Sequence, residues 1–450
     1  MKNPNFPKHF HFGTSTSSYQ IEGNYDGTGA GKSIWTTFCQ QENAILNGED
    51  GEIACDHYRR WQEDIKLMQE LGIHSYRFSL SWPRIIPEGT GAINQEGLDF
   101  YDKLVDGLLE AGITPFPTLY HWDLPQALQD KGGWASSDIS DAFAAYTETI
   151  VKTLGDRVSN IFTLNEPWVF LHLGHVSGVH APGYKDPEFA AKVYKNILIT
   201  HGKAMQTIKS INPDIKAGHC CNFEDYQPKT NSEEDRKAAE LYFDYQNMIF
   251  SDPWEKGRFT PAAEKAFGVT EESFTDEELK IITTPNDLMG FNYYTKYLVS
   301  HDPTQYLNCR TETPGGPVTD MNWVINPNGL SKLLEWAYNR YKQPIYVTEN
   351  GCAYDYPVEN GRVRDKKRID YLEKHLNACE ETLEKGVDLR AYHVWSFLDN
   401  FEWALGYSKR FGIVHVDFET QQRIIKNSGY FYRDFIRNHE VSLEEQISEN

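Results

Sequence analysis

The chain has 450 residues, a length that suits two or three domains or one large barrel. Its composition, 40% hydrophobic and 14% aromatic, is sufficient for a large core and for aromatic surfaces that stack on sugars. The formal net charge of −21 argues against nucleic acid or an anionic membrane as a partner, because a phosphate-binding surface needs positive charge.

Segments typical of strands and of helices alternate from the start of the chain. An aromatic strand is expected at residues 10–15, followed by a glycine-rich loop at 22–51. A helix should then begin before Tyr58 and end at Gly72, because apolar residues recur at three- and four-residue spacing. A strand at 75–80 and a helix from Asn94 to Gly112 come next, and the third strand is expected at 114–120.

The second half of the chain continues the alternation. A helix at about 137–154 leads to the fourth strand at 161–166, and further strands are expected at 215–219, 288–293, 343–348 and 391–397. A helical segment follows each of the eight strands. This pattern predicts an α/β protein with a closed parallel (β/α)8 barrel, the TIM barrel. Residues 1–450 contain no proline- or serine-rich linker, so one domain is expected.

Two acids stand at the ends of apolar strands. Glu349 follows the β-branched run that ends at Thr348, and Glu166 lies between Asn165 and a proline. A lone acid there would more simply cap the next turn. Two acids held by separate rigid strands are what glycoside hydrolysis requires.

Other polar and aromatic residues fall at the same strand ends, where a β/α barrel builds its active site. Each residue alone has a structural explanation, but their joint placement on one rim indicates a functional site. The residues are Gln20, Arg77, His121, Trp122, Asn165, Asn292, Tyr294, Trp395, Glu402 and Trp403.

Six motifs in consistent order resemble glycoside hydrolase family 1, the β-glucosidase family of retaining enzymes on a β/α barrel. The likeness runs from about residue 7 to residue 435. The motifs are SYQIEG at 18–23, RFSLSWPR at 77–84, HWDLP at 121–125, TLNEP at 163–167, TENG at 348–351 and WSFLDNFEW at 395–403.

The resemblance implies a double displacement. Glu349 would be the nucleophile that forms a covalent glycosyl-enzyme, and Glu166 the acid and then the base, with the carboxyls about 5–5.5 Å apart. Arg77 and Tyr294 would favour the ionised form of Glu349, whereas apolar surroundings near Trp168 would help Glu166 to keep its proton.

The resemblance also implies the sugar contacts. Gln20, His121, Asn165, Glu402 and Trp403 would hold the hydroxyls, with Asn165 near the 2-hydroxyl. Trp395 would form a platform under the ring, followed by a non-proline cis peptide bond, and Phe411 would form a wall. We expect Trp122, Asn292 and Tyr294 to complete the substrate site. Trp168, Leu173, His180 and Trp323 would line the aglycone entrance.

Two residues separate the chain from relatives in the family. A carboxylate at Glu402, facing O4 and O6, would repel the phosphate of a 6-phospho-β-glycoside. Glu166 stands where plant thioglucosidases carry glutamine. Within the enzyme interpretation β-glucosidase is favoured, with β-galactosidase, β-fucosidase and transglycosylation as alternative or side activities, because few contacts read O4 and such differences are worth about 1–3 kcal/mol.

Two rival functions belong to other classes. A non-catalytic sugar-binding barrel should have lost one acid, yet both are present. A metal-dependent barrel hydrolase using His121 and His57 would be inhibited by chelators. His172 and His175 have a ligand spacing, but no Asp or Cys completes a set, and we expect them in an irregular loop. No metal and no cofactor is therefore predicted.

The cysteines and the N-terminus bear on location. The seven cysteines are scattered and odd in number, which fits reduced thiols better than a disulfide framework. Residues 1–7 lack the apolar core of a signal peptide, and no apolar run reaches the length of a membrane span. These features predict a cytoplasmic enzyme acting on small β-glucosides such as cellobiose and short oligosaccharides. A homo-oligomer is compatible with them.

Overall fold

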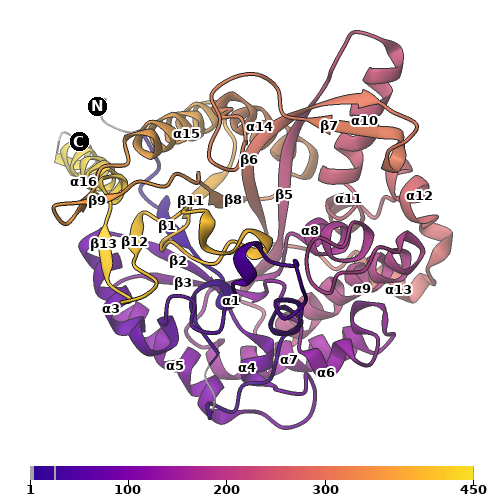
Figure 1. The fold of residues 1–450 in the computed structure, drawn as a ribbon, viewed down its shortest axis with the longest axis horizontal. Coiled ribbons are helices and arrows are strands. Elements are labelled where there is room, and N and C mark those ends of the chain that lie inside the picture. Colours follow the sequence, from indigo (N-terminus) through magenta and orange to yellow (C-terminus); the bar gives the residue numbers. More distant parts are fainter. Residues whose placement is uncertain (1–4, 25–26, 449–450) are drawn as a thin grey trace.

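A computed structural model describes residues 5–24 and 27–448. Eight parallel strands form a barrel that the pairing of β5 with β6 closes (Figure 1). This confirms the predicted (β/α)8 barrel. The barrel strands are β1 His11–Ser15, β2 Ser75–Ser79, β3 Thr114–Tyr120, β4 Asn160–Asn165, β5 Lys216–Pro228, β6 Leu288–His301, β8 Ile345–Asn350 and β11 Leu389–Trp395.

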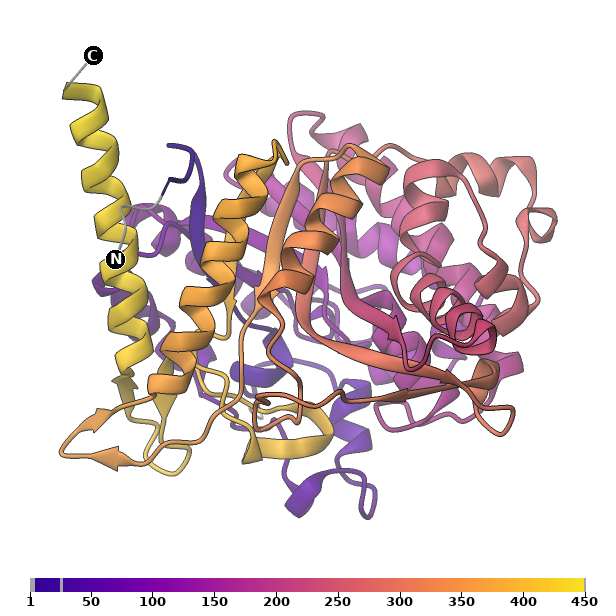
Figure 2. The same ribbon diagram turned by 90° about the horizontal axis from the view of Figure 1, so that it is seen from above.

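Long helices surround the barrel as crossovers. In Figure 2 the C-terminal helix, in yellow, lies beside the orange helices that precede it, and α15 contacts both α14 and α16. The long helices are α3 His57–Glu70, α5 Gln95–Glu110, α7 Ile139–Leu154, α9 Pro187–Ile211, α10 Glu233–Asn247, α14 Pro327–Tyr341, α15 Lys366–Glu384 and α16 Asn427–Ser448.

Apolar periodicity explains these helices, as α7 illustrates. Ile139, Phe143, Tyr146, Ile150 and Leu154 are buried on one face, at the spacing of an amphipathic helix. The helix begins two residues after the predicted start, because residues 137 and 138 form a turn before it.

Shorter elements occupy the loops. The helices are α1 Ser18–Ile21, α2 Ile34–Phe38, α4 Trp82–Ile85, α6 Gln126–Gln129, α8 Pro167–Leu171, α11 Ser251–Lys256, α12 Pro261–Phe267 and α13 Asp276–Ile282. The strands are β7 Cys309–Glu312, β9 Val358–Glu359, β10 Arg362–Val363, β12 Val414–Val416 and β13 Arg423–Ile425. Among the described helices none is long and apolar enough to cross a membrane.

The barrel interior is layered. One layer is apolar and consists of Phe116, Phe162, Cys220, Leu288, Tyr346 and Ala391. The guanidinium of Arg77 lies 5.9 Å from the centre of the Phe162 ring and hydrogen-bonds to Cys220. A layer of buried polar side chains, which includes Arg77, therefore rests on the apolar layer at the C-terminal end of the barrel.

Strands β5 and β6 are much longer than expected. They have 13 and 14 residues and stay paired as far as Pro228 and Val299, and β7 adds an antiparallel strand to the outer part of β6 (Figure 1). The predicted ends at residues 219 and 293 are wrong. The outer halves contain polar residues such as Asp225 and Lys296, and pairing with the neighbouring strand keeps them extended.

The segment that carries His172 and His175 is also more regular than expected. Residues His172–Val176 form a π-helical turn directly after α8, so the expectation of an irregular loop is wrong. His172 Nδ1 lies 2.8 Å from the Tyr245 hydroxyl, and His175 Nδ1 lies 2.8 Å from the Phe170 carbonyl. These contacts hold both rings within the fold.

Candidate active site

A pocket of about 430 Å³ opens at the C-terminal ends of the strands. Most of the residues predicted for a substrate site line it. They are His121, Trp122, Glu166, Trp168, Leu173, His180, Tyr294, Trp323, Glu349, Trp395, Glu402, Trp403 and Phe411. The two acids, the aromatic platform and the expected entrance residues thus share one cavity.

Four further predicted residues, Gln20, Arg77, Asn165 and Asn292, are buried and are not among the lining residues. Gln20 Nε2 donates hydrogen bonds to Asn400 Oδ1 and to the Phe401 carbonyl, at 3.0 and 2.7 Å. Gln20 therefore holds the segment that leads to Glu402, and its contact with a sugar stays a prediction.

Glu349 stands at the end of β8 and is 3% exposed. Arg77 Nη1 donates a hydrogen bond of 2.5 Å to Glu349 Oε1, and the Tyr294 hydroxyl donates one of 2.7 Å to Oε2. Burial raises the pKa of Glu349 above its usual value, and the Arg77 charge and these hydrogen bonds oppose this rise. Both partners stabilise the carboxylate form.

Glu166 has a different environment. It begins α8 with a left-handed backbone, φ 46°, and its amide donates to the Cys220 carbonyl at 2.7 Å. Burial, and then the negative charge of Glu349, raise the pKa of Glu166 well above its usual value, while a hydrogen bond from Asn292 lowers it. Two neighbouring carboxyls are thereby suited to opposite roles, one as an acid and one as an anion.

A buried network connects the two acids. Arg77 Nη2 donates to Asn165 Oδ1 at 2.7 Å, and Asn292 Nδ2 donates both to that oxygen, at 3.1 Å, and to Glu166 Oε1, at 2.7 Å. Asn165 Nδ2 lies 3.0 Å from His121 Nε2. Movement of any one of these side chains would disturb the others, because their hydrogen bonds are shared.

Aromatic rings form the walls. Trp395, Phe411 and Tyr294 form a cluster against which Trp323 packs. The ring centre of Trp403 lies 4.5 Å from that of Trp122. The peptide between Trp395 and Ser396 is cis, as the resemblance implied. Flat apolar faces beside buried polar groups suit a sugar ring, which has C–H faces and a rim of hydroxyls.

Glu402 supplies a third carboxyl to the pocket. Burial and the charge of Glu349 raise its pKa to about 8. Its Oε2 atom is buried and has no hydrogen-bond partner. A ligand hydroxyl at this position would satisfy the carboxyl.

One wall of the pocket was not predicted from the sequence. The outer parts of β5 and β6, together with α10, contribute Asn222, Glu224, Tyr226, Tyr242, Gln246 and Tyr297. Glu224 Oε2 accepts a hydrogen bond of 3.1 Å from the Thr295 amide, and burial raises the pKa of Glu224 well above its usual value. The alternation of Asn222, Glu224 and Tyr226 with their neighbours is a period-two signal that could have revealed this face.

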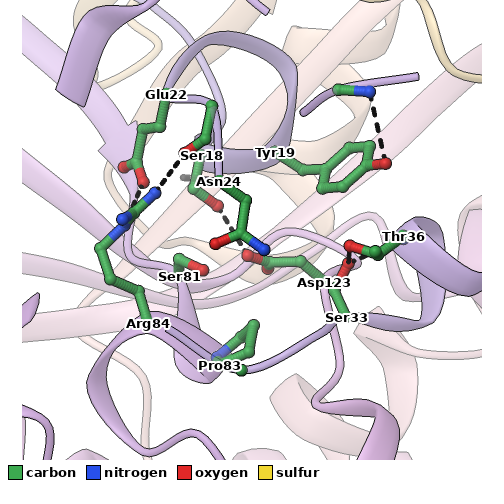
Figure 3. Close-up of a pocket in the computed structure, with 13 residues that line it drawn as sticks. Ser18, Tyr19, Glu22, Asn24, Ser33, Thr36, Ser81, Pro83, Arg84 and Asp123 are labelled. Atoms are coloured by element: carbon green, nitrogen blue, oxygen red, sulfur yellow. Dashed lines mark hydrogen bonds and ion pairs between the residues drawn. The ribbon is translucent and has the colours of Figure 1, made fainter. Parts of the chain in front are cut away.

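A smaller cavity, of about 20 Å³, lies among α1 and the loops after β2 and β3 (Figure 3). Ser18 Oγ donates to Asp123 Oδ2 at 2.8 Å, and Arg84 Nε donates to Glu22 Oε2 at 2.9 Å. Burial raises the pKa of Asp123 to about 8. The Ser18 bond joins helix α1, which carries Gln20, to the loop that carries His121 and Trp122.

Comparisons with known proteins agree with this geometry. The model of "Glycosyl hydrolase family 1" matches residues 2–441. The chain belongs to glycosyl hydrolase family 1. It is an enzyme, a glycoside hydrolase of the β-glucosidase family.

Similar proteins in this family come from several bacteria. β-Glucosidase A of Acetivibrio thermocellus is 47% identical over 444 residues, covering 96% of this chain and 98% of that protein. The bifunctional β-D-glucosidase/β-D-fucosidase of Bifidobacterium breve is 39% identical over 462 residues, with coverages of 96% and 98%. The solved family 1 β-glucosidase of Thermotoga maritima superposes with a TM-score of 0.93 at 44% identity, covering 97% of this chain and 99% of that one.

Proposed function

We propose that this enzyme is a retaining β-glucosidase that releases terminal non-reducing β-D-glucosyl residues by double displacement through a covalent glycosyl-enzyme. The observation that carries the proposal is the contrast between the two acids of one pocket. Glu349 has an arginine and a tyrosine that favour its anion, and burial together with the Glu349 charge keeps the proton on Glu166.

In the first step Glu349 attacks the anomeric carbon while Glu166 gives its proton to the leaving oxygen. Arg77 and Tyr294 hold Glu349 by one bond to each oxygen, which fixes the direction of attack. The sugar lies against Trp395, and the unpartnered oxygen of Glu402 binds a hydroxyl.

In the second step the roles of Glu166 are reversed. The glycosyl ester of Glu349 has no charge, so the contribution of that charge to the raised pKa of Glu166 disappears and only the effect of burial is left. Glu166 can then ionise and take a proton from a water molecule, while the oxygen of that water attacks the anomeric carbon and the bond to Glu349 breaks to release its carboxylate. The second inversion at this carbon gives a product with the original β-configuration.

The substrates we propose are cellobiose, short cello-oligosaccharides and aryl or alkyl β-glucosides. The wall formed by Asn222, Glu224 and Tyr226 offers polar groups for a second sugar, and Trp168 and Trp323 offer faces for an aryl group. Side activity on β-fucosides fits the bifunctional relative from Bifidobacterium breve. β-Galactosidase activity and transglycosylation are further proposed side reactions, and a role in cellulose degradation belongs to the same proposal.

The test is to identify, by ¹H NMR during rapid hydrolysis of an aryl β-glucoside, which anomer of glucose is released first. Retention predicts that β-glucose appears first and then mutarotates. The first appearance of α-glucose would contradict the mechanism, and the absence of hydrolysis by folded protein would favour the sugar-binding alternative. Cell fractionation of the native host and sedimentation would test the predicted cytoplasmic location and the oligomeric state.

A further inference from the structure

The Asn292 side chain occupies the centre of the network between the acids. It is fully buried, and all four of its hydrogen-bonding positions are used. Its Nδ2 donates to Glu166 and Asn165, as described above. Its Oδ1 accepts a hydrogen bond of 2.6 Å from Thr348 Oγ1 and one of 3.2 Å from Cys220 Sγ.

The hydrogen bonds of this network have a consistent direction. Arg77 can only donate, so Asn165 must turn its oxygen toward it, and Asn292 must then turn its NH₂ group toward that oxygen. Reversal of the Asn292 amide would place its carbonyl against Asn165 Oδ1 and Glu166 Oε1. The amide orientation therefore decides whether Glu166 faces a donor or an acceptor.

The oxygen of the Asn292 amide is held by Thr348 and Cys220, whose side chains do not line the pocket. Cys220 Sγ lies 2.9 Å from Thr348 Oγ1 and 3.6 Å from Arg77 Nη2, which donates to it. Burial raises the pKa of Cys220 to about 12, so the thiol keeps its proton and remains a donor. The thiol donates this proton to Asn292 Oδ1, and the Thr348 hydroxyl donates its own proton to the same oxygen.

We propose that Thr348 and Cys220 are positioning residues that hold the Asn292 amide with its NH₂ group toward Glu166, and so prepare Glu166 to act as the base in the second step. The inference rests on the proposed function, because it assigns an origin to one property of the acid/base residue. Neither side chain lines the pocket, and both contact Asn292, so we assign their effect on the reaction to this amide.

Loss of the amide orientation should shift the pKa of Glu166 in one direction, which a general loss of packing would not do. A donor at Glu166 Oε1 stabilises the carboxylate and lowers its pKa. When the amide loses its fixed orientation, the pKa of Glu166 should rise in the free enzyme and in the glycosyl-enzyme. In the pH profile of kcat/KM, the alkaline limb reports loss of the proton from Glu166 in the free enzyme. In the pH profile of deglycosylation, the acidic limb reports protonation of Glu166 in the glycosyl-enzyme. Both limbs should move to higher pH.

The matched variants are Thr348→Val and Thr348→Ser. Valine keeps the shape of threonine without the hydroxyl, whereas serine keeps the hydroxyl. We expect Thr348→Val to move both limbs up by about one pH unit, and so to slow deglycosylation about tenfold at pH values well below its acidic limb. In Thr348→Ser, both limbs should lie at the same pH as in the unmodified enzyme, within experimental error. Deglycosylation is measured as kcat with 2,4-dinitrophenyl β-glucoside, whose leaving group makes the second step limiting.

Cys220→Ala and Cys220→Ser form a second pair, which decides the question if Thr348→Val does not fold. The alanine variant should shift both limbs in the same direction by a smaller amount, and the serine variant should not. Unchanged limbs in the folded Thr348→Val variant, or in Cys220→Ala where it serves in its place, would overturn the inference. Equal shifts of the limbs in Thr348→Val and Thr348→Ser, or in Cys220→Ala and Cys220→Ser, would also overturn the inference.

Glu166→Ala separates this inference from the proposed function. Sensitivity to the leaving group in Glu166→Ala, together with restored activity on addition of azide, would establish the acid/base role without reference to Thr348. If that role is established and Thr348→Val has unchanged limbs, only the positioning inference fails. If Glu166→Ala loses no activity on poor leaving groups, the proposed function fails first.

Discussion

Arg77 forms an ion pair with Glu349, with 2.5 Å between Nη1 and Oε1, and its second terminal nitrogen binds Asn165. One guanidinium thus contacts the proposed nucleophile and orients the amide network that reaches Glu166. The fork geometry of arginine allows both contacts, and a lysine could not reproduce them. The Arg77 charge opposes the rise in the pKa of Glu349 that burial causes, whereas burial and the charge of Glu349 raise the pKa of Glu166 well above its usual value.

The Tyr294 hydroxyl should set the acidic limit of activity. It donates a 2.7 Å hydrogen bond to Glu349 Oε2, so Tyr294→Phe removes a group that lowers the pKa of Glu349. Because Glu349 must be ionised to attack, the acidic limb of kcat/KM should move up by about one pH unit. The control is Tyr293→Phe, since Tyr293 donates instead to the Asn326 carbonyl. An acidic limb that stays in place in Tyr294→Phe would refute this role.

Loss of Glu166 should depend on the leaving group. In Glu166→Ala no acid protonates the departing oxygen, so kcat/KM for cellobiose should fall about 10²- to 10⁴-fold. A 2,4-dinitrophenyl leaving group needs little protonation, and kcat/KM for that glucoside should fall far less. Steady-state kinetics over a series of aryl glucosides provides the measurement. Equal losses for good and poor leaving groups would exclude the assignment of Glu166 as the acid.

Glu224 should distinguish aglycones. Its carboxyl lies in the wall formed by β5 and β6, and burial favours its protonated form. In Glu224→Ala, which removes the carboxyl, we expect KM for cellobiose to rise about tenfold, the loss of roughly one good hydrogen bond. The values for an aryl glucoside should change little. Asp225→Asn is the neighbouring control, since Asp225 is bonded to Gln227 and Asn326 and is not a lining residue. The same change in KM for both substrates would remove Glu224 from the aglycone site.

Chelation should leave activity unchanged. Within the part of the chain that the structure describes, no group of three or more His, Cys, Asp or Glu side chains could hold a metal ion. Dialysis against EDTA, followed by an assay, tests this prediction. Loss of activity that Zn²⁺ restores would support the metal-dependent alternative.

The main features of the fold and pocket could be predicted because they depend on local patterns. Glu166 and Glu349 follow apolar strands, and the polar residues after the other strands must meet at the same end of a parallel barrel. The pairing of Arg77 and Tyr294 with Glu349 was expected from the resemblance and is confirmed by the hydrogen bonds.

Other features depend on tertiary contacts, which the local sequence indicates weakly or not at all. The outer part of β5, with Asn222 and Glu224, is extended because β6 pairs with it along its whole length. The π-helical turn at His172–Val176 likewise depends on Tyr245, which is distant in sequence. The contacts of Thr348 and Cys220 with Asn292 join three strands, and no spacing along the chain indicates them.

The most direct test of the account is intact-protein mass after incubation with 2,4-dinitrophenyl 2-deoxy-2-fluoro-β-glucoside, followed by peptide mapping. The fluorine slows both steps and the activated leaving group lets the first proceed, so the glycosyl-enzyme should accumulate. We predict one added fluoroglucosyl unit, on the peptide that contains Glu349, and none on Glu349→Gln. An adduct on a different residue, or no adduct on folded protein that hydrolyses β-glucosides, would contradict the assignment of Glu349 as the nucleophile.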